Sequence, residues 1–156
     1  MDSFYFFLQE IRERPGLYLG GKSLEALGHF WAGYGYCSFI ERWEKATGRD
    51  YFENYEEARC SDVGREPFEQ HFMYGFDEFV HEYYNCVMTT LNGKSLISKN
   101  SDSDGEAFDK FFELFDEYLK LTDMQKEKIK TNAQKRFRES FEPEIETLDR
   151  GTTVDL

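Results

Sequence analysis

The sequence has little of what would place a protein in a membrane or outside the cell. No apolar run approaches the roughly 20 residues of a membrane-spanning helix. The N-terminus, Met-Asp-Ser-Phe-Tyr-Phe-Phe, lacks the positive flank and the small-residue cleavage site of a signal peptide. The cysteines Cys37, Cys60 and Cys86 are odd in number and form no Cys-x-x-Cys pair, which argues against a disulfide framework. We therefore expect a cytoplasmic protein, not bound to membranes, whose thiols are buried and reduced.

Motifs that would indicate catalysis or metal binding are incomplete. The segment 102–106 has the aspartates of a calcium loop, but its glycine comes too early and the later ligands are missing. The segment 81–85 begins as His-Glu but has Asn where a zinc helix needs its second histidine. Gly33-Tyr34-Gly35 does not follow a strand, so it is no phosphate loop. We expect no catalytic residue, no cofactor and no metal.

The negative charge is concentrated in the middle of the chain. Residues 50–119 contain 17 acidic and five basic residues, whereas the segments before and after contain equal numbers of each. The whole net charge of −12 therefore lies in this middle part. Such a field repels nucleic acid and attracts basic proteins, although it also serves solubility. The basic run 126–138 opposes it and is expected to pair with the acidic middle or to be solvated.

Hydrophobic periodicity predicts helices throughout and no strand. Pro15 is expected to end the first helix, Ser23 to cap the second and Gly48 to end it, while Gly33 and Gly35 permit close helix approach or a bend. Asn92-Gly93 is expected to end the third helix, before a polar linker over 94–105, and Thr122 with Gln125 forms a capping box. The expected helices cover residues 3–13, 23–48, 67–91, 106–119 and the chain from 122 onward, with a short helix near Tyr51, Phe52 and Tyr55.

These elements predict an all-α fold, a single-domain bundle of five or six helices. The domain is expected to cover residues 1–142, and residues 143–156 are expected to form an exposed tail. Aromatic residues make up 18% of the chain, so much ring surface must be buried or used for association.

The segment from Ile11 to Gly20 resembles two known protein families. Its Arg-Pro-Gly-Leu-Tyr-Leu-Gly phrase is similar to one in the ATPase segment of type II topoisomerases, but the Glu-x-x-x-Asn helix and the nucleotide loop of that family are missing. The phrase also resembles the N-terminus of small bacterial immunity-type proteins associated with polymorphic or contact-dependent growth inhibition toxins. Ser23-Leu24, Gly33-Tyr34 and the segment 106–114 extend that second resemblance. It implies a binding protein that neutralises a cognate toxin domain.

Tyrosines and carboxylates after the second helix suggest where a basic toxin cleft would bind. Tyrosines give rigid anchors, and acidic groups give charge complementarity. The expected partner-binding residues are Tyr51, Glu53, Tyr55, Glu56, Glu57, Asp62, Glu66 and Glu69. Two alternatives remain open. One is a small helical enzyme that pairs Cys37 or Cys86 with His29 or His81. The other is a homodimeric regulatory protein that associates through aromatic surface.

Overall fold

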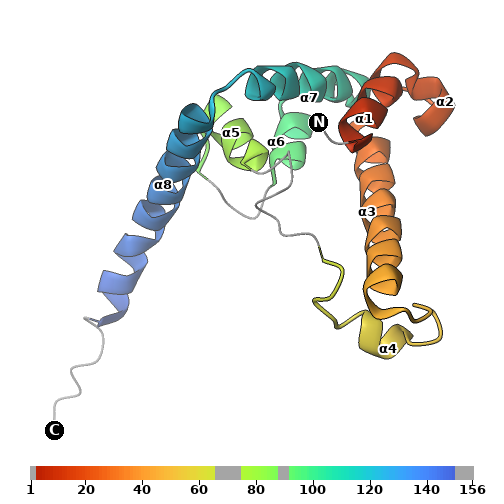
Figure 1. Cartoon of the computed structure of the whole chain (residues 1–156). Coiled ribbons are helices and arrows are strands. Elements are labelled where there is room, and N and C mark those ends of the chain that lie inside the picture. The colour runs from red at the N-terminus through yellow and green to blue at the C-terminus, as the bar shows by residue number, and fades with distance from the viewer. Residues whose placement is uncertain (1–2, 66–74, 88–91, 150–156) are drawn as a thin grey trace, which may run out of the picture. The chain divides into compact units, whose positions relative to one another are not determined.

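Helices are the regular structure of the part of the chain that the structure describes. This computed structural model describes residues 3–65, 75–87 and 92–149, and for residues 3, 4 and 141–149 the backbone alone. These residues form eight helices and no strand, which confirms the all-α fold (Figure 1). The number exceeds six because short helices also form in two segments expected to be a link and a linker. The chain falls into two compact units, Met1–Tyr74 and Gly75–Leu156.

The first unit begins with three helices, α1 (Ser3–Glu13), α2 (Pro15–Leu19) and α3 (Leu24–Thr47). Pro15 does more than end α1, because it occupies the first turn of α2, where its missing N–H and fixed φ cost nothing. The ring of Phe7 in α1 lies 5.3 Å from Tyr18 in α2 and 5.5 Å from Phe30 in α3. One phenylalanine thus joins the three helices.

Helix α3 has the two ends that the sequence predicts. The Ser23 hydroxyl accepts a hydrogen bond of 2.9 Å from the Ala26 N–H. Gly48 is left-handed and donates its N–H to the Glu44 carbonyl at 2.7 Å. Between these ends, Gly33 and Gly35 have open space where a side chain would be, with no described atom within 4 Å. The described residues therefore supply no helix that approaches them closely.

The second unit contains α5 (Phe76–Tyr83), α6 (Gly93–Lys99), α7 (Asp104–Leu119) and α8 (Asp123–Asp149), and α5 contacts the other three. The Phe76 ring meets the rings of Phe111, Phe115 and Tyr118 edge-on, each at 5.5 Å. Ser103 caps α7, since its hydroxyl accepts from the Glu106 N–H at 3.1 Å. The apolar residues of α7 recur at helical spacing and form a buried face that includes this cluster.

The expected helix over 67–91 is corrected in its second half. Helix α5 ends at Tyr83, and Asn85 has a positive φ of 51°. Asn92 caps the start of α6 by accepting from the Ser95 N–H at 2.9 Å. The expected polar linker is therefore partly helical, because Leu96 and Ile97 become buried. Residues 66–74 and 88–91 lie outside the described residues.

Helix α8 begins as predicted and continues further than expected. Thr122 and Gln125 form the capping box, since the Thr122 N–H donates to the Gln125 side chain at 2.9 Å. The helix passes Pro143 and reaches Asp149, so part of the expected tail is helical. From the basic run, Arg136 forms an ion pair with Glu82 of α5 and donates to the Asn85 side chain at 3.2 Å. One cation of this run thus has the expected internal acidic partner.

The cysteines depart from the expected burial. All three thiols are free, and Cys37 and Cys60 are exposed, while Cys86 is half-buried. Cys37 lies in the exposed middle of α3, and Cys60 follows α4, where the turn leaves it in solvent. None of the described helices has the length and apolar character that crossing a bilayer requires.

Candidate partner-binding surface

Six of the eight expected partner-binding residues fall in a described segment that folds back on the end of α3. Residues 49–65 contain the short helix α4 (Tyr55–Ala58), and we call this segment the corner. A small apolar cluster holds it, in which Trp43 of α3 packs with Tyr51 and Ala58 of the corner. All three are almost fully buried. The corner is therefore a packed structure with its own core.

Tyr51 is the centre of this core. Its side chain is fully buried, with ring centroids 5.4–6.0 Å away in near-perpendicular contacts. The surrounding rings belong to Tyr36, Phe39, Trp43, Phe52 and Tyr55. Tyr51 was expected to touch a partner, but its side chain is buried under these rings in the described chain, so they and not Tyr51 lie at the surface. Tyr51 positions exposed neighbours instead.

The Tyr51 hydroxyl lies 3.1 Å from the hydroxyl of Tyr36 in α3. This hydrogen bond, followed by desolvation, raises the pKa of Tyr51 to about 12. At the other end of the residue, the Tyr51 N–H donates to the Glu44 carboxylate at 2.9 Å. Both contacts tie the corner to α3.

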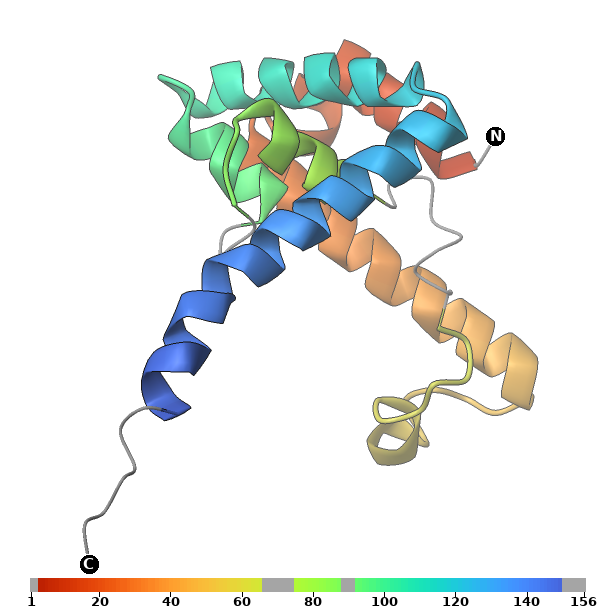
Figure 2. The same cartoon turned by 90° about the vertical axis from the view of Figure 1, so that its left-hand side faces the viewer.

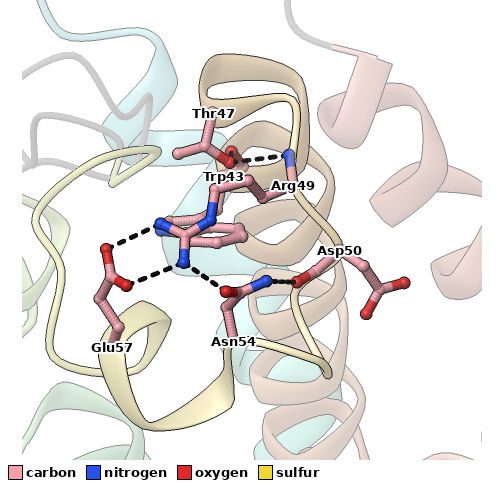
Figure 3. A network of polar contacts seen from close by, with 6 residues as sticks. All are labelled: Trp43, Thr47, Arg49, Asp50, Asn54 and Glu57. Carbon is pink, nitrogen blue, oxygen red and sulfur yellow. Dashed lines mark hydrogen bonds and ion pairs between the residues drawn. The ribbon is translucent and has the colours of Figure 1, made fainter.

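Arg49 joins the start of the corner to α4 (Figure 3). Its guanidinium donates one hydrogen bond to each carboxylate oxygen of Glu57, both at 2.9 Å, and another to the Asn54 side chain. These bonds favour the charged form of Glu57 and hold the pKa of its carboxyl below the usual value. The guanidinium carbon also lies 5.7 Å from the centre of the Trp43 ring, within cation–π range.

Further hydrogen bonds fix the chain on either side of this network. The Asn54 amide donates to the Asp50 carbonyl at 2.8 Å, which closes the turn before α4. At the far end, Arg42 of α3 donates to the Gly64 carbonyl at 2.8 Å. Gly64 has a φ of +79°, and a Cβ there would lie 2.7 Å from the backbone nitrogen of Trp43. Only glycine allows the chain to pass α3 this closely.

This frame leaves three large apolar side chains at the surface. Phe52 is 69% exposed, Tyr55 44% and Val63 46%. Phe52 and Tyr55 are also packed edge-on against the buried Tyr51 ring, which fixes their directions. The corner therefore presents apolar groups that are exposed and yet held in place.

The carboxylates around these groups are largely neutralised within the corner. Glu56 pairs with Arg59 at 2.8 Å, and Asp62 lies 3.7 Å from Arg65. Glu57 forms an ion pair with Arg49, as described. Glu53 is exposed, and within the described chain we find no cation paired with it. The expected acidic surface is thus weaker here than the residue count suggests, and Glu66 and Glu69 lie outside the described residues.

Sequence reasoning missed Phe52 and Val63 as exposed groups and Arg49 as the organising residue. Phe52 had a usable signal, because it neighbours a tyrosine in a segment without helical periodicity. Arg49 had none, since its partner Glu57 lies eight residues away across a turn.

The two histidines of the alternative Cys/His site have other described contacts. His29 lies 3.8 Å from the carboxylate of Glu25, one turn earlier in α3. His81 is buried, and its Nδ1 lies 2.7 Å from the Asp77 carbonyl. In the described ranges, no three His, Cys, Asp or Glu residues are grouped as metal ligands would be.

Comparison of the chain with protein-family models, with curated proteins and with solved structures finds no match.

Proposed function

We propose that this protein is a binding module that recognises another protein through the corner. The observation that carries the proposal is the placement of Phe52, Tyr55 and Val63 at the surface of a frame held by Tyr51 and Arg49. Preordered apolar side chains lose little conformational entropy when a partner covers them. Aromatic groups of this kind commonly provide most of the binding energy of an interface.

Within this class, we propose an immunity-type inhibitor of a cognate bacterial toxin domain, acting in the cytoplasm without nucleic acid or membrane. The resemblance of the segment from Ile11 to Gly20 supports this choice. The corner would cover a basic substrate cleft of the toxin, with the apolar groups giving affinity and Glu53 giving charge complementarity. Glu56, Glu57 and Asp62 contribute less to the field, because each has an arginine of its own.

The first test is co-expression with the C-terminal toxin domain encoded immediately upstream in the native locus. Restored growth and a complex that co-elutes would support the proposal. Toxicity that persists without a complex would contradict this pairing.

The second test locates the surface. Phe52→Ala and Tyr55→Ala should each weaken the complex by roughly tenfold or more, as expected for central aromatic contacts. Met124→Ala, which removes a side chain that is 81% exposed in the other unit, serves as the control. Equal affinities for all three variants would show that the corner is not the interface.

A matched pair of charge-reversal variants tests whether charge at the corner steers association. Glu53→Lys should lower the association rate and its salt dependence, because the toxin cleft is expected to be basic. Glu117→Lys makes the same charge change at an exposed position of α7. If both variants slow association equally, the steering charge is not at the corner.

A further inference from the structure

Aromatic rings and arginines are paired repeatedly at the corner. Three rings each have an arginine of the same chain over them, with the guanidinium carbon 5.3–5.8 Å from the ring centre. The pairs are Arg49 with Trp43, Arg59 with Tyr55 and Arg65 with Phe39. These distances are within the range of cation–π contacts, in which the face of a ring attracts a positive charge. A cation over a ring is therefore a recurring contact of this surface.

The Phe52 ring is the exception. It is the most exposed aromatic side chain among the described residues, at 69%, and no described cation lies over it. Its contact with the buried Tyr51 ring is edge-to-face, with an angle of 86° between the two ring planes. Such a contact covers at most one face of a ring. Because most of the side chain is exposed, at least one face of Phe52 remains available to a partner.

Two carboxylates lie in the same turn as Phe52. Figure 2 shows this turn as the link between the end of α3 and α4. The Glu53 N–H donates to the Asp50 carboxylate at 2.9 Å, which places that carboxylate beside the peptide bond between Phe52 and Glu53. The Asp50 side chain points away from the Arg49 guanidinium (Figure 3). Both acidic side chains are exposed, and within the described ranges no cation pairs with either.

An arginine side chain suits both features of this turn. A ring face and a carboxylate each attract positive charge. A guanidinium is planar, so it can stack on a ring while the N–H groups at its edge donate to carboxylates beside the ring. The corner already contains this arrangement, because the Arg49 guanidinium lies over Trp43 and donates two hydrogen bonds to Glu57.

We propose that the turn of residues 50–53 receives an arginine side chain of the partner protein. The guanidinium stacks on the open face of Phe52 and donates hydrogen bonds to Asp50 and Glu53. This inference rests on the proposed function, and it adds the chemical group by which the partner is recognised. In a basic toxin cleft, such an arginine is one that would otherwise meet the negative charge of the substrate.

The first experiment uses the full-length protein and requires no toxin. A tetra-arginine peptide is titrated while NMR follows the amide signals of residues 52 and 53. These signals should shift to saturation, whereas a tetra-citrulline peptide, which has a similar shape without the charge, should not shift them. A tetra-lysine peptide should bind the turn less tightly. Absent shifts, equal shifts with tetra-citrulline or equal affinity for tetra-lysine would overturn the proposal.

Two ring variants separate the turn from the general negative charge of the chain. Phe52→Leu keeps both carboxylates and an apolar side chain but removes the ring, so tetra-arginine should bind the turn roughly two- to fivefold more weakly. Phe6→Leu removes a ring that is 58% exposed on α1 and should leave this affinity unchanged. Equal affinities in the two variants would show that the Phe52 ring does not hold the guanidinium.

A neutral variant tests the carboxylates. Asp50→Asn combined with Glu53→Gln removes both charges but keeps a side-chain oxygen at residue 50 that can accept from the N–H of residue 53. The turn should therefore keep its shape, and the amide signals of residues outside it should stay in place. Tetra-arginine should then bind more weakly than to the native chain. Native affinity in this variant would overturn the proposal.

The toxin complex supplies the last measurement. Phe52→Leu should weaken the complex, and Phe6→Leu should not. A complex that keeps its native affinity in Phe52→Leu would overturn this inference and leave the proposed function standing. Failure to form any complex would instead contradict the proposed function, and the peptide titration would still decide whether the turn takes an arginine.

Discussion

The hydroxyl oxygens of Tyr36 and Tyr51 lie 3.1 Å apart, although one ring is half exposed on α3 and the other is at the centre of the corner. The hydrogen bond stabilises the protonated form of Tyr51, whose pKa rises to about 12 from the ordinary value of 10.0. The corner and the ionisation of one tyrosine are therefore linked.

We expect this link to appear as alkaline loss of stability. A pKa that is raised in the folded state contributes stability in full below the unfolded value, and this stability is lost as the pH rises from about 10 to about 12. Absorbance titration of tyrosinate should show late-ionising groups in the native chain, because burial also raises the pKa of Tyr84, and Tyr51 should be among them. Tyr36→Phe should lower the pKa of Tyr51 and leave that of Tyr84 unchanged, because it removes the main cause of the Tyr51 shift alone. Tyr5→Phe is the control, and an identical effect of both variants would contradict the assignment.

Glu57→Gln should loosen the corner. The variant removes the charge that Arg49 holds with two hydrogen bonds, so amide hydrogen exchange across residues 50–58 should accelerate. Glu56→Gln is the matched control, because its partner Arg59 lies within one turn and joins no distant segment. Equal exchange in the two variants would show that Arg49 does not organise the corner.

The same carboxyl gives an acid-side dependence. Because the pKa of Glu57 is lowered in the folded state, its contribution is present above the ordinary value of 4.5 and is lost as the pH falls through the lowered value. Exchange of the corner amides should therefore accelerate in acid in the native chain. In Glu57→Gln this acceleration should be smaller, since the titrating group is gone.

Gly64→Ala should destabilise the first unit by more than about 1 kcal/mol, because alanine is strained at positive φ and its Cβ would meet the backbone of Trp43. Gly48→Ala separates the two causes, since Gly48 has a φ of +69° with open space around it. Gly48→Ala should therefore destabilise the first unit less than Gly64→Ala does. Thermal unfolding of both variants measures the difference, and equal losses would show that the close approach to Trp43 costs nothing.

Gly33→Ala should change the stability in the opposite direction to Gly64→Ala. Gly33 lies inside α3 with open space around its Cα, so alanine should stabilise the isolated chain by roughly 0.5–1 kcal/mol through helix propensity. If the variant binds the toxin domain less well while being more stable, the partner approaches α3 at this glycine. A destabilised variant would show that α3 is packed there in solution.

Local signals were enough to predict helix ends, and distant contacts explain the errors. Ser23 and Gly48 act within one turn of α3, so their roles follow from the sequence. Asn92-Gly93 is ambiguous, because asparagine and glycine occur at both kinds of helix end. Here a contact across 16 residues favours a helix start, since the Gly93 N–H donates to the Asp77 carboxylate.

The candidate surface was predicted as a region but not in its detail. Carboxylates and tyrosines mark residues 51–62 as distinctive, but burial depends on which rings meet. Tyr51 became core because α3 brings Phe39 and Trp43 to it, and Phe52, one residue later, became surface. The partner of Glu57 also lies beyond any helical spacing, so charge counting overestimated the free acidity of the corner.

The crowding of five rings around Tyr51 has a consequence for its motion. A ring enclosed edge-on from several directions cannot rotate about its own axis unless its neighbours move apart together. The two sides of the Tyr51 ring should then give separate proton resonances, whereas freely turning tyrosines give averaged ones. The rate at which these signals merge on warming would measure how often the whole corner opens, read from a single buried side chain.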